Sequence, residues 1–215
     1  MLENIRREVH QALLKLPESG LVMGTSGNVS GRDGNKIIIK PSGVTYEKLN
    51  PEDLVIVNRE GEVLEGELKP SVDTAAHLHI YNNTKDIGGI VHTHSTYATA
   101  FAAMGRSIPL YLTEQGDQFG TRIPVSDYVP PGDEAIGKEF SKKAGGGRLK
   151  GLIMKQHGVF TSAPSPLEAL KAAITIEHSA RVSYVAESGG NPSELSEEEG
   201  QKLYKKYMEH YGQEE

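Results

Sequence analysis

The segment that most constrains the fold is residues 87–94, IGGIVHTH, an apolar run that ends in two closely spaced histidines. Its glycines and β-branched side chains predict a short buried strand. Because alternate side chains of a strand share a face, His92 and His94 point to the same side and Thr93 to the other. Two imidazoles on one face form half of a tetrahedral metal site. If they bind a metal, the rest of the chain has to bring the remaining ligands to the end of this strand.

Helical and extended segments are mixed along the rest of the chain. Apolar spacing and capping residues predict helices over residues 2–16, 71–83 (with Ser71 as its N-cap), 95–105, 133–143, 166–187 and 191–212. Strands are predicted over residues 36–40, in a hairpin at 53–66, and in two runs at 149–163 that join near His157. Residues 20–36 suggest a strand that enters a polar loop, and residues 110–120 a strand or a loop. This order predicts one α/β layered domain over residues 1–215, with a central, mostly antiparallel sheet flanked by helices.

The absence of cysteine limits the kinds of site that the chain can form. Disulfides, thiolate zinc sites and cysteine nucleophiles are excluded, so any metal must be held by His, Asp or Glu. The net charge of −6 argues against a nucleic-acid or membrane surface as the main partner, but it is compatible with a local pocket for an anion. The N-terminus lacks the apolar core of a signal peptide, and no run approaches the length of a membrane span. We therefore expect a cytoplasmic protein.

A third histidine, His157, ends the apolar strand GLIM and directly precedes Gly158. Strand ends that open into loops commonly carry functional side chains. His92, His94 and His157 would supply three neutral nitrogens, and a fourth position left to water or substrate is typical of catalytic zinc. Asp73 is the best candidate for an additional carboxylate.

The alternative is that the two strand histidines are partly buried and hydrogen-bonded, without a metal. Spacing alone does not decide, because His77 and His79 repeat the H-x-H pattern on a predicted helix, where the two side chains point about 200° apart. We interpret both as core-facing or supporting side chains. Structural or surface roles are assigned to the other helical histidines, His10, His178 and His210.

Several motifs, taken together and in their order along the chain, resemble the class II aldolase / L-ribulose-5-phosphate 4-epimerase family. They are GNVS (27–30), KPSGV (40–44), GELKPSVDTAAHL (66–78), GGIVHTHSTYAT (88–99), the pair Pro109 and Asp117, KQHGVF (155–160) and YGQ (211–213). The resemblance extends over nearly the whole chain. It implies a Zn²⁺-type metal held by histidines, a pocket for a phosphate group, and a C4 homotetramer whose active sites lie between subunits.

The resemblance assigns roles to individual residues of this chain. The metal ligands would be His92, His94 and His157, joined by Asp73. Asp73, which is Asp in the epimerases and typically Glu in the fuculose-phosphate aldolases, would also take part in catalysis. The phosphate-binding positions would be Asn28, Ser42, Gly43 and Ser71, because glycine-rich turns expose backbone N–H groups and hydroxyls add donors, although each turn alone could be a plain turn. The acid/base pair would be Asp117 and Tyr211, which in the family reach the site from a neighbouring subunit.

These assignments predict a metal-dependent L-ribulose-5-phosphate 4-epimerase that cleaves and re-forms the C3–C4 bond by a retro-aldol/aldol sequence. The cofactor would be Zn²⁺, or another divalent metal such as Mn²⁺ or Co²⁺, acting as a Lewis acid. Asp117 would serve as the base and Tyr211 as the acid on the two faces of the aldehyde. The partners would be a sugar phosphate and the other subunits of a homotetramer, with no nucleic acid and no membrane.

Four positions depart from the pattern of the family's epimerases. Val72 replaces a serine of KPSSDT, Glu114 and Gln115 replace a Thr and a His of THAD, and Leu203 stands where the epimerases carry a histidine. A different sugar therefore stays open, as does a class II ketose-1-phosphate aldolase of the fuculose-phosphate type, which releases dihydroxyacetone phosphate and an aldehyde. Two further hypotheses are a dehydratase of the methylthioribulose-phosphate type, suggested only by Glu114, and a non-catalytic adducin-like domain, against which the retained histidines argue.

Overall fold

The computed structural model describes residues 1–144 and 150–210. Its α-helices are α1 (Leu2–Glu18), α2 (Thr74–Asn83), α3 (Thr96–Met104), α4 (Thr113–Phe119), α5 (Glu134–Lys143), α6 (Pro166–Gly189) and α7 (Glu197–His210). Its strands are β1 (Asn28–Asp33), β2 (Lys36–Ile39), β3 (Val55–Val57), β4 (Val63–Glu65), β5 (Gly89–Thr93), β6 (Lys150–Met154) and β7 (Gly158–Ala163). Two short 3₁₀ helices, η1 (Tyr46–Lys48) and η2 (Pro51–Asp53), lie between β2 and β3.

The strands of the described part of the chain form one sheet, in the order β4-β3-β2-β1-β5-β7-β6. All neighbouring strands in it are antiparallel. The predicted α/β class with a mostly antiparallel central sheet is therefore confirmed. Strand β5, which carries His92 and ends one residue before His94, is buried throughout and pairs with β1 on one side and β7 on the other.

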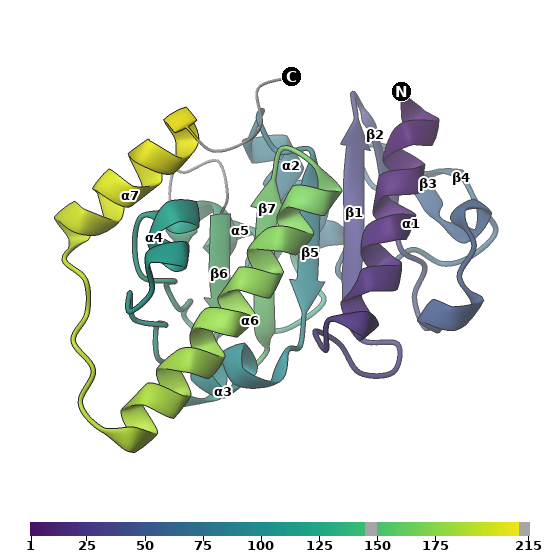
Figure 1. Ribbon diagram of the computed structural model, residues 1–215. Coiled ribbons are helices and arrows are strands. Elements are labelled where there is room, and N and C mark those ends of the chain that lie inside the picture. Colours follow the sequence, from purple (N-terminus) through teal and green to yellow (C-terminus); the bar gives the residue numbers. More distant parts are fainter. Residues whose placement is uncertain (145–149, 211–215) are drawn as a thin grey trace.

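Helices cover both faces of this sheet (Figure 1). On the near face in this view, Val9 of α1 and Leu170 of α6 share a buried cluster with Val91 of β5. On the far face, Phe140 of α5 shares a second cluster with Ile90. Ile90 and Val91 are adjacent in β5, and strand alternation sends them to opposite faces. No helix in the described ranges has the combined length and apolar character that a membrane crossing needs.

Residues 110–120, expected to form a strand or a loop, contain the helix α4 instead. This helix ends at Gly120, which has the left-handed conformation with φ 69°. Gly116, in the middle of α4, packs so closely on α7 that a Cβ atom there would lie 2.8 Å from Leu203 Cδ1. The glycines weaken the local helix signal, so packing against α7 decides the conformation of this segment.

Three predicted boundaries are also wrong. The polar segment at 20–27 comes before β1, so Asn28 is the first residue of a strand and does not follow one. Ser71 is not the N-cap of α2, which begins at Thr74; the Ser71 carbonyl instead accepts the Thr74 N–H in a tight turn. The last helix begins at Glu197 and not at residue 191. Each error lies where a turn, whose geometry depends on its neighbours, meets a regular element.

Candidate active site

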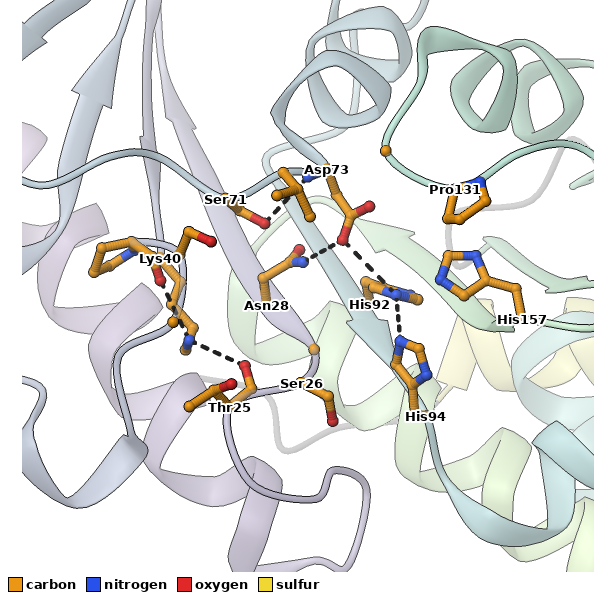
Figure 2. A pocket seen from close by; sticks show the side chains of 16 residues that line it. Thr25, Ser26, Asn28, Lys40, Ser71, Asp73, His92, His94, Pro131 and His157 are labelled. Carbon is orange, nitrogen blue, oxygen red and sulfur yellow. Dashed lines mark hydrogen bonds and ion pairs between the residues drawn. The ribbon is translucent and has the colours of Figure 1, made fainter.

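The three predicted histidines meet at one end of the sheet (Figure 2). His92 lies on β5, His94 just beyond its end, and His157 in the turn that joins β6 to β7. Because β5 pairs with β7, with Thr93 opposite Val159, this turn lies beside the end of β5. The centroids of the three rings are 4.6, 4.8 and 5.0 Å apart. One nitrogen from each ring lies within 4.8 Å of the others.

The turn that carries His157 is tightly constrained on both sides. Gln156 has φ 58°, in the left-handed region that residues with a side chain rarely adopt. Gly158 follows His157, and a Cβ atom at this glycine would lie 2.3 Å from the Thr93 carbonyl oxygen and 3.2 Å from His92 Cε1. The close approach of the two histidines therefore requires glycine at position 158.

The surroundings keep all three imidazoles in the neutral form that a metal ligand needs. Burial, followed by the nearby His94 and His157, lowers the pKa of His92 well below its usual value. Burial also lowers the pKa of His94 and of His157. With its proton on Nδ1, His92 donates to the Val159 carbonyl at 3.0 Å, which leaves Nε2 unprotonated, 2.9 Å from His94 Nε2. This set of convergent nitrogens fits a divalent cation such as Zn²⁺.

Asp73 precedes α2 and points toward the same cluster (Figure 2). Its buried carboxylate accepts a hydrogen bond from Asn28 Nδ2 at 2.8 Å, and Oδ2 lies 3.8 Å from His92 Nε2. Among the described residues, the group whose ligand atoms can share one ion consists of the histidines, and Asp73 lies beside it. This position allows contact with a bound water or a substrate hydroxyl, and direct ligation by Asp73 stays a prediction.

The histidines and Asp73 line a pocket of about 620 Å³ that also contains the predicted phosphate positions. Its lining residues are Thr25, Ser26, Gly27, Asn28, Lys40, Pro41, Ser42, Gly43, Ser71, Val72, Asp73, His92, His94, Pro131, Gly132 and His157. Gly43 has the left-handed conformation, with φ 72°, that such a turn requires. Hydroxyls and turn amides thus share one pocket with the imidazoles, and Val72 is an exposed apolar side chain among them.

Lys40 is a pocket residue that the sequence interpretation missed. Its side chain is buried, and Nζ donates to the carbonyl oxygens of Thr25 and Pro41, each at 3.3 Å. Nζ also lies 5.1 Å from the centroid of the Tyr46 ring. None of these partners of Lys40 in the described part of the chain is a carboxylate. Burial lowers the pKa of Lys40. A buried ammonium group without a carboxylate partner is suited to bind an anion. In the sequence, the feature that could have indicated Lys40 is its position between an apolar strand and the turn PSG.

The chain does not bring its own Asp117 into this pocket. Asp117 lies on α4 and is not among the lining residues. Partial burial raises its pKa, the charge of Lys206 on α7 lowers it, and Glu114 raises it. Tyr211 lies outside the described residues. The acid/base roles of Asp117 and Tyr211 therefore stay predictions.

The fold and the pocket together define a protein that can hold a divalent cation next to a small anionic molecule. Residues 7–184 match the family described as Class II Aldolase and Adducin N-terminal domain. This match covers most of the chain, and the protein belongs to the class II aldolase family. The resemblance drawn from the motifs is thereby confirmed.

Similar solved structures agree with this assignment. An L-fuculose 1-phosphate aldolase is 28% identical, with a TM-score of 0.89, over 95% of this chain and 96% of that chain. The L-fuculose-1-phosphate aldolase from Thermus thermophilus is 27% identical, with a TM-score of 0.73, over 88% and 98% of the two chains. YgbL from Escherichia coli, described as a candidate aldolase/epimerase/decarboxylase, is 24% identical, with a TM-score of 0.82, over 94% and 98%. At that identity the likeness to YgbL concerns the fold alone.

Proposed function

We propose that the protein is a metal-dependent enzyme that breaks the C3–C4 bond of a phosphorylated ketose. The observation that carries this proposal is the pocket itself, where three neutral imidazoles and donors for an anion line the same cavity. A cavity of this size suits a small substrate. Membership of the class II aldolase family supports the same class of reaction.

His92, His94 and His157 would hold the cation, for which we propose Zn²⁺, with Mn²⁺ or Co²⁺ as alternatives. When bound, the cation supplies Lewis acidity, which stabilises negative charge on the ketose oxygens as the carbon–carbon bond breaks. Ser42, Gly43, Ser71 and Asn28, together with the buried ammonium group of Lys40, would bind the phosphate. These contacts orient the substrate between the two sides of the pocket.

Proton transfer would complete the reaction. A base takes the proton of the C4 hydroxyl, the electron pair of the C3–C4 bond moves to C3, and C4 becomes an aldehyde. Asp117 from a second copy of the chain would act as this base and Tyr211 as the acid on the opposite face. Asp73, held by Asn28 at 2.8 Å, is placed to orient a substrate hydroxyl.

As the specific reaction we propose 4-epimerisation of L-ribulose 5-phosphate. Here the aldehyde rotates and is attacked on its other face, so protons must be handled on both faces. The position of Asp117 outside the pocket of its own chain supports a homotetramer in which each site is completed by a neighbouring subunit.

A second candidate is a ketose-1-phosphate aldolase. The two L-fuculose 1-phosphate aldolase structures support it. In that reaction the aldehyde leaves, C3 is protonated, and dihydroxyacetone phosphate is released.

A panel of pentulose and hexulose phosphates, assayed with the Zn²⁺-loaded protein, distinguishes the two candidates. Formation of D-xylulose 5-phosphate from L-ribulose 5-phosphate is the result that we expect. Release of dihydroxyacetone phosphate from ketose 1-phosphates would instead establish the aldolase, and no turnover of any member would refute both. His94→Ala should lose bound metal and activity while its circular dichroism spectrum stays that of the parent protein.

A further inference from the structure

A row of polar side chains, all buried except the half-buried Arg32, joins α2 to β1 and begins at the wall of the pocket. The side chains on β1 are Asn28, Ser30 and Arg32, and those facing them are Asp73, His77 and Tyr81, one before α2 and two within it. We call this set the polar ladder. Its members on β1 are two residues apart and those on the α2 side four residues apart. These are the spacings at which side chains share one face of a strand and of a helix.

Each rung of the polar ladder is a direct contact. Asn28 Nδ2 donates to Asp73 Oδ2 at 2.8 Å. Ser30 Oγ lies 2.6 Å from His77 Nδ1 and 2.9 Å from Tyr81 OH. At the far end, Arg32 Nη1 donates to the Tyr81 carbonyl at 3.0 Å, and the guanidinium lies 5.3 Å from the centroid of that ring.

The spacing of the rungs fixes how far α2 can move along β1. Two strand residues advance about 6.6 Å and four helical residues about 6 Å, so the two rows stay matched. Displacement of α2 by one residue would break all three rungs. The polar ladder therefore ties the axial position of α2 to β1, and at its pocket end Asp73 Oδ2 lies 3.8 Å from His92 Nε2.

Stability alone does not account for these residues. Ser30 and His77 are fully buried, and His77 Nε2 has no hydrogen-bond partner in the described part of the chain. A buried polar atom without a partner costs about 1–3 kcal/mol. Apolar side chains of similar volume at such positions are often neutral or stabilising, so a role in fixing the register of α2 explains this polar set better than stability does.

We propose that His77 is a positioning residue for Asp73. Through Ser30 it holds α2 in the register that keeps the Asp73 carboxylate beside the histidine cluster. A second contact acts in the same place. The rings of His77 and Phe160 form a T-shaped pair with centroids 5.7 Å apart, and Phe160 stacks on His92 with centroids 4.2 Å apart. The catalytic consequence rests on the proposed function, whereas the position of Asp73 can be measured without turnover.

Three variants test this role. His77→Leu removes the rung, and His77→Asn keeps a polar group near the position of Nδ1. His79→Leu is the matched control on the same helix, because His79 Nδ1 lies 2.8 Å from Glu134 of α5 and does not line the pocket. Should His77→Leu fail to fold, Ser30→Ala removes only the hydroxyl of the same rung.

Crystal structures of the Zn²⁺-loaded parent and variants give the primary readout. We expect the Asp73 carboxylate to shift by about 1 Å or more in His77→Leu, and to keep its place in His77→Asn and His79→Leu. Such a shift should lower kcat by about 10- to 100-fold. KM, metal content and the midpoint of thermal unfolding should stay near those of the parent, because the three histidines and the phosphate donors remain.

The outcomes separate this inference from the proposed function. If Asp73 keeps its place in His77→Leu, the inference is overturned, whatever the activity. If Asp73 shifts but the parent protein turns over no sugar phosphate, the proposed function fails and the positioning role stands. Equal loss of kcat in His77→Leu and His79→Leu would also overturn the inference, since a general effect on α2 would then explain both.

Discussion

His92 shows what a single residue of the site can and cannot reveal through its sequence context. Its direction was predictable, because strand alternation puts it on the same face as His94. Its protonation state was not, because the proton on Nδ1 depends on the Val159 carbonyl at 3.0 Å, which is distant in sequence. Stacking of Phe160 on its ring at 4.2 Å was equally hidden, since it follows from the pairing of β5 with β7.

Lys40 gives the first prediction at the residue scale. Lys40→Met should raise KM for a sugar phosphate by about 10- to 100-fold, because a hydrogen bond to a charged group contributes about 1.5–3 kcal/mol. Stability should not fall, because the change removes a buried ammonium group for which the described residues supply only carbonyl oxygens and a ring face. Steady-state kinetics and urea unfolding measure the two effects.

The matched control is Lys36→Met, at the exposed start of β2, the strand that directly precedes Lys40. It should leave KM unchanged. An unchanged KM in Lys40→Met would show that the phosphate does not reach this ammonium group.

His77 gives a prediction about pH. Burial lowers its pKa to about 3 from the ordinary value of 6.5. Between these two values the unfolded chain takes up a proton that the folded protein does not bind. The contribution of neutral His77 to stability is therefore complete above pH 6.5 and is lost as the pH falls toward 3.

Urea unfolding of the metal-free protein at several pH values in this window measures that loss. We expect His77→Leu to lose stability less steeply than the parent on acidification, by up to about 1.4 kcal/mol per pH unit. The other histidines are present in both proteins, so most of their contribution cancels in the comparison. Identical slopes would mean that His77 does not stay neutral in the folded state.

At the scale of elements, local signals sufficed where a helix end is set by its own residues. The Ser165 side chain accepts the Glu168 N–H ahead of Pro166 at the start of α6, and Asp133 caps α5 in the same way. Both helices were predicted close to their observed bounds. The helix α4 was missed because its conformation depends on α7, which no local pattern around Gly116 reports.

The junction of β5 and β7 gives a prediction at this scale. Gly158→Ala would place a Cβ atom 2.3 Å from the Thr93 carbonyl oxygen, where only a backbone shift can relieve the clash. We expect a loss of about 2 kcal/mol or more in the free energy of unfolding, and weaker metal binding because His92 and His157 move apart. Chemical denaturation and metal titration check the two effects.

Gly189→Ala provides the control, because among the described residues nothing outside the local turn of α6 lies within 4 Å of a Cβ built at that glycine. This substitution should be neutral or slightly stabilising. If Gly158→Ala behaves in the same way as Gly189→Ala, the turn that carries His157 is more adaptable than its contacts indicate.

At the scale of the whole molecule, the order of the motifs predicted the family, and the structure brings most of the predicted site residues to one pocket. Asn28, Ser42, Gly43, Ser71 and the histidines do line one cavity. Asp117 does not, and a sequence cannot show whether a second subunit supplies it, because that depends on the shape of a surface formed by distant segments.

Mixed oligomers test this arrangement. His94→Ala and Asp117→Asn should each be inactive alone. Equal amounts reassembled together should regain about one quarter of the parent activity, because in that share of sites one subunit supplies His94 and its neighbour supplies Asp117. Activity assays after mixing, with size-exclusion chromatography to measure the assembly, provide the readout. No recovery in well-mixed oligomers would place the function of Asp117 within one chain.

The most direct test of the central claim is an anomalous difference map at the zinc edge, from crystals loaded with Zn²⁺. We predict one peak per subunit, about 2.0–2.1 Å from a nitrogen of each of His92, His94 and His157. A map of the loaded, active protein with no peak among these three rings would contradict the claim that they hold the catalytic cation.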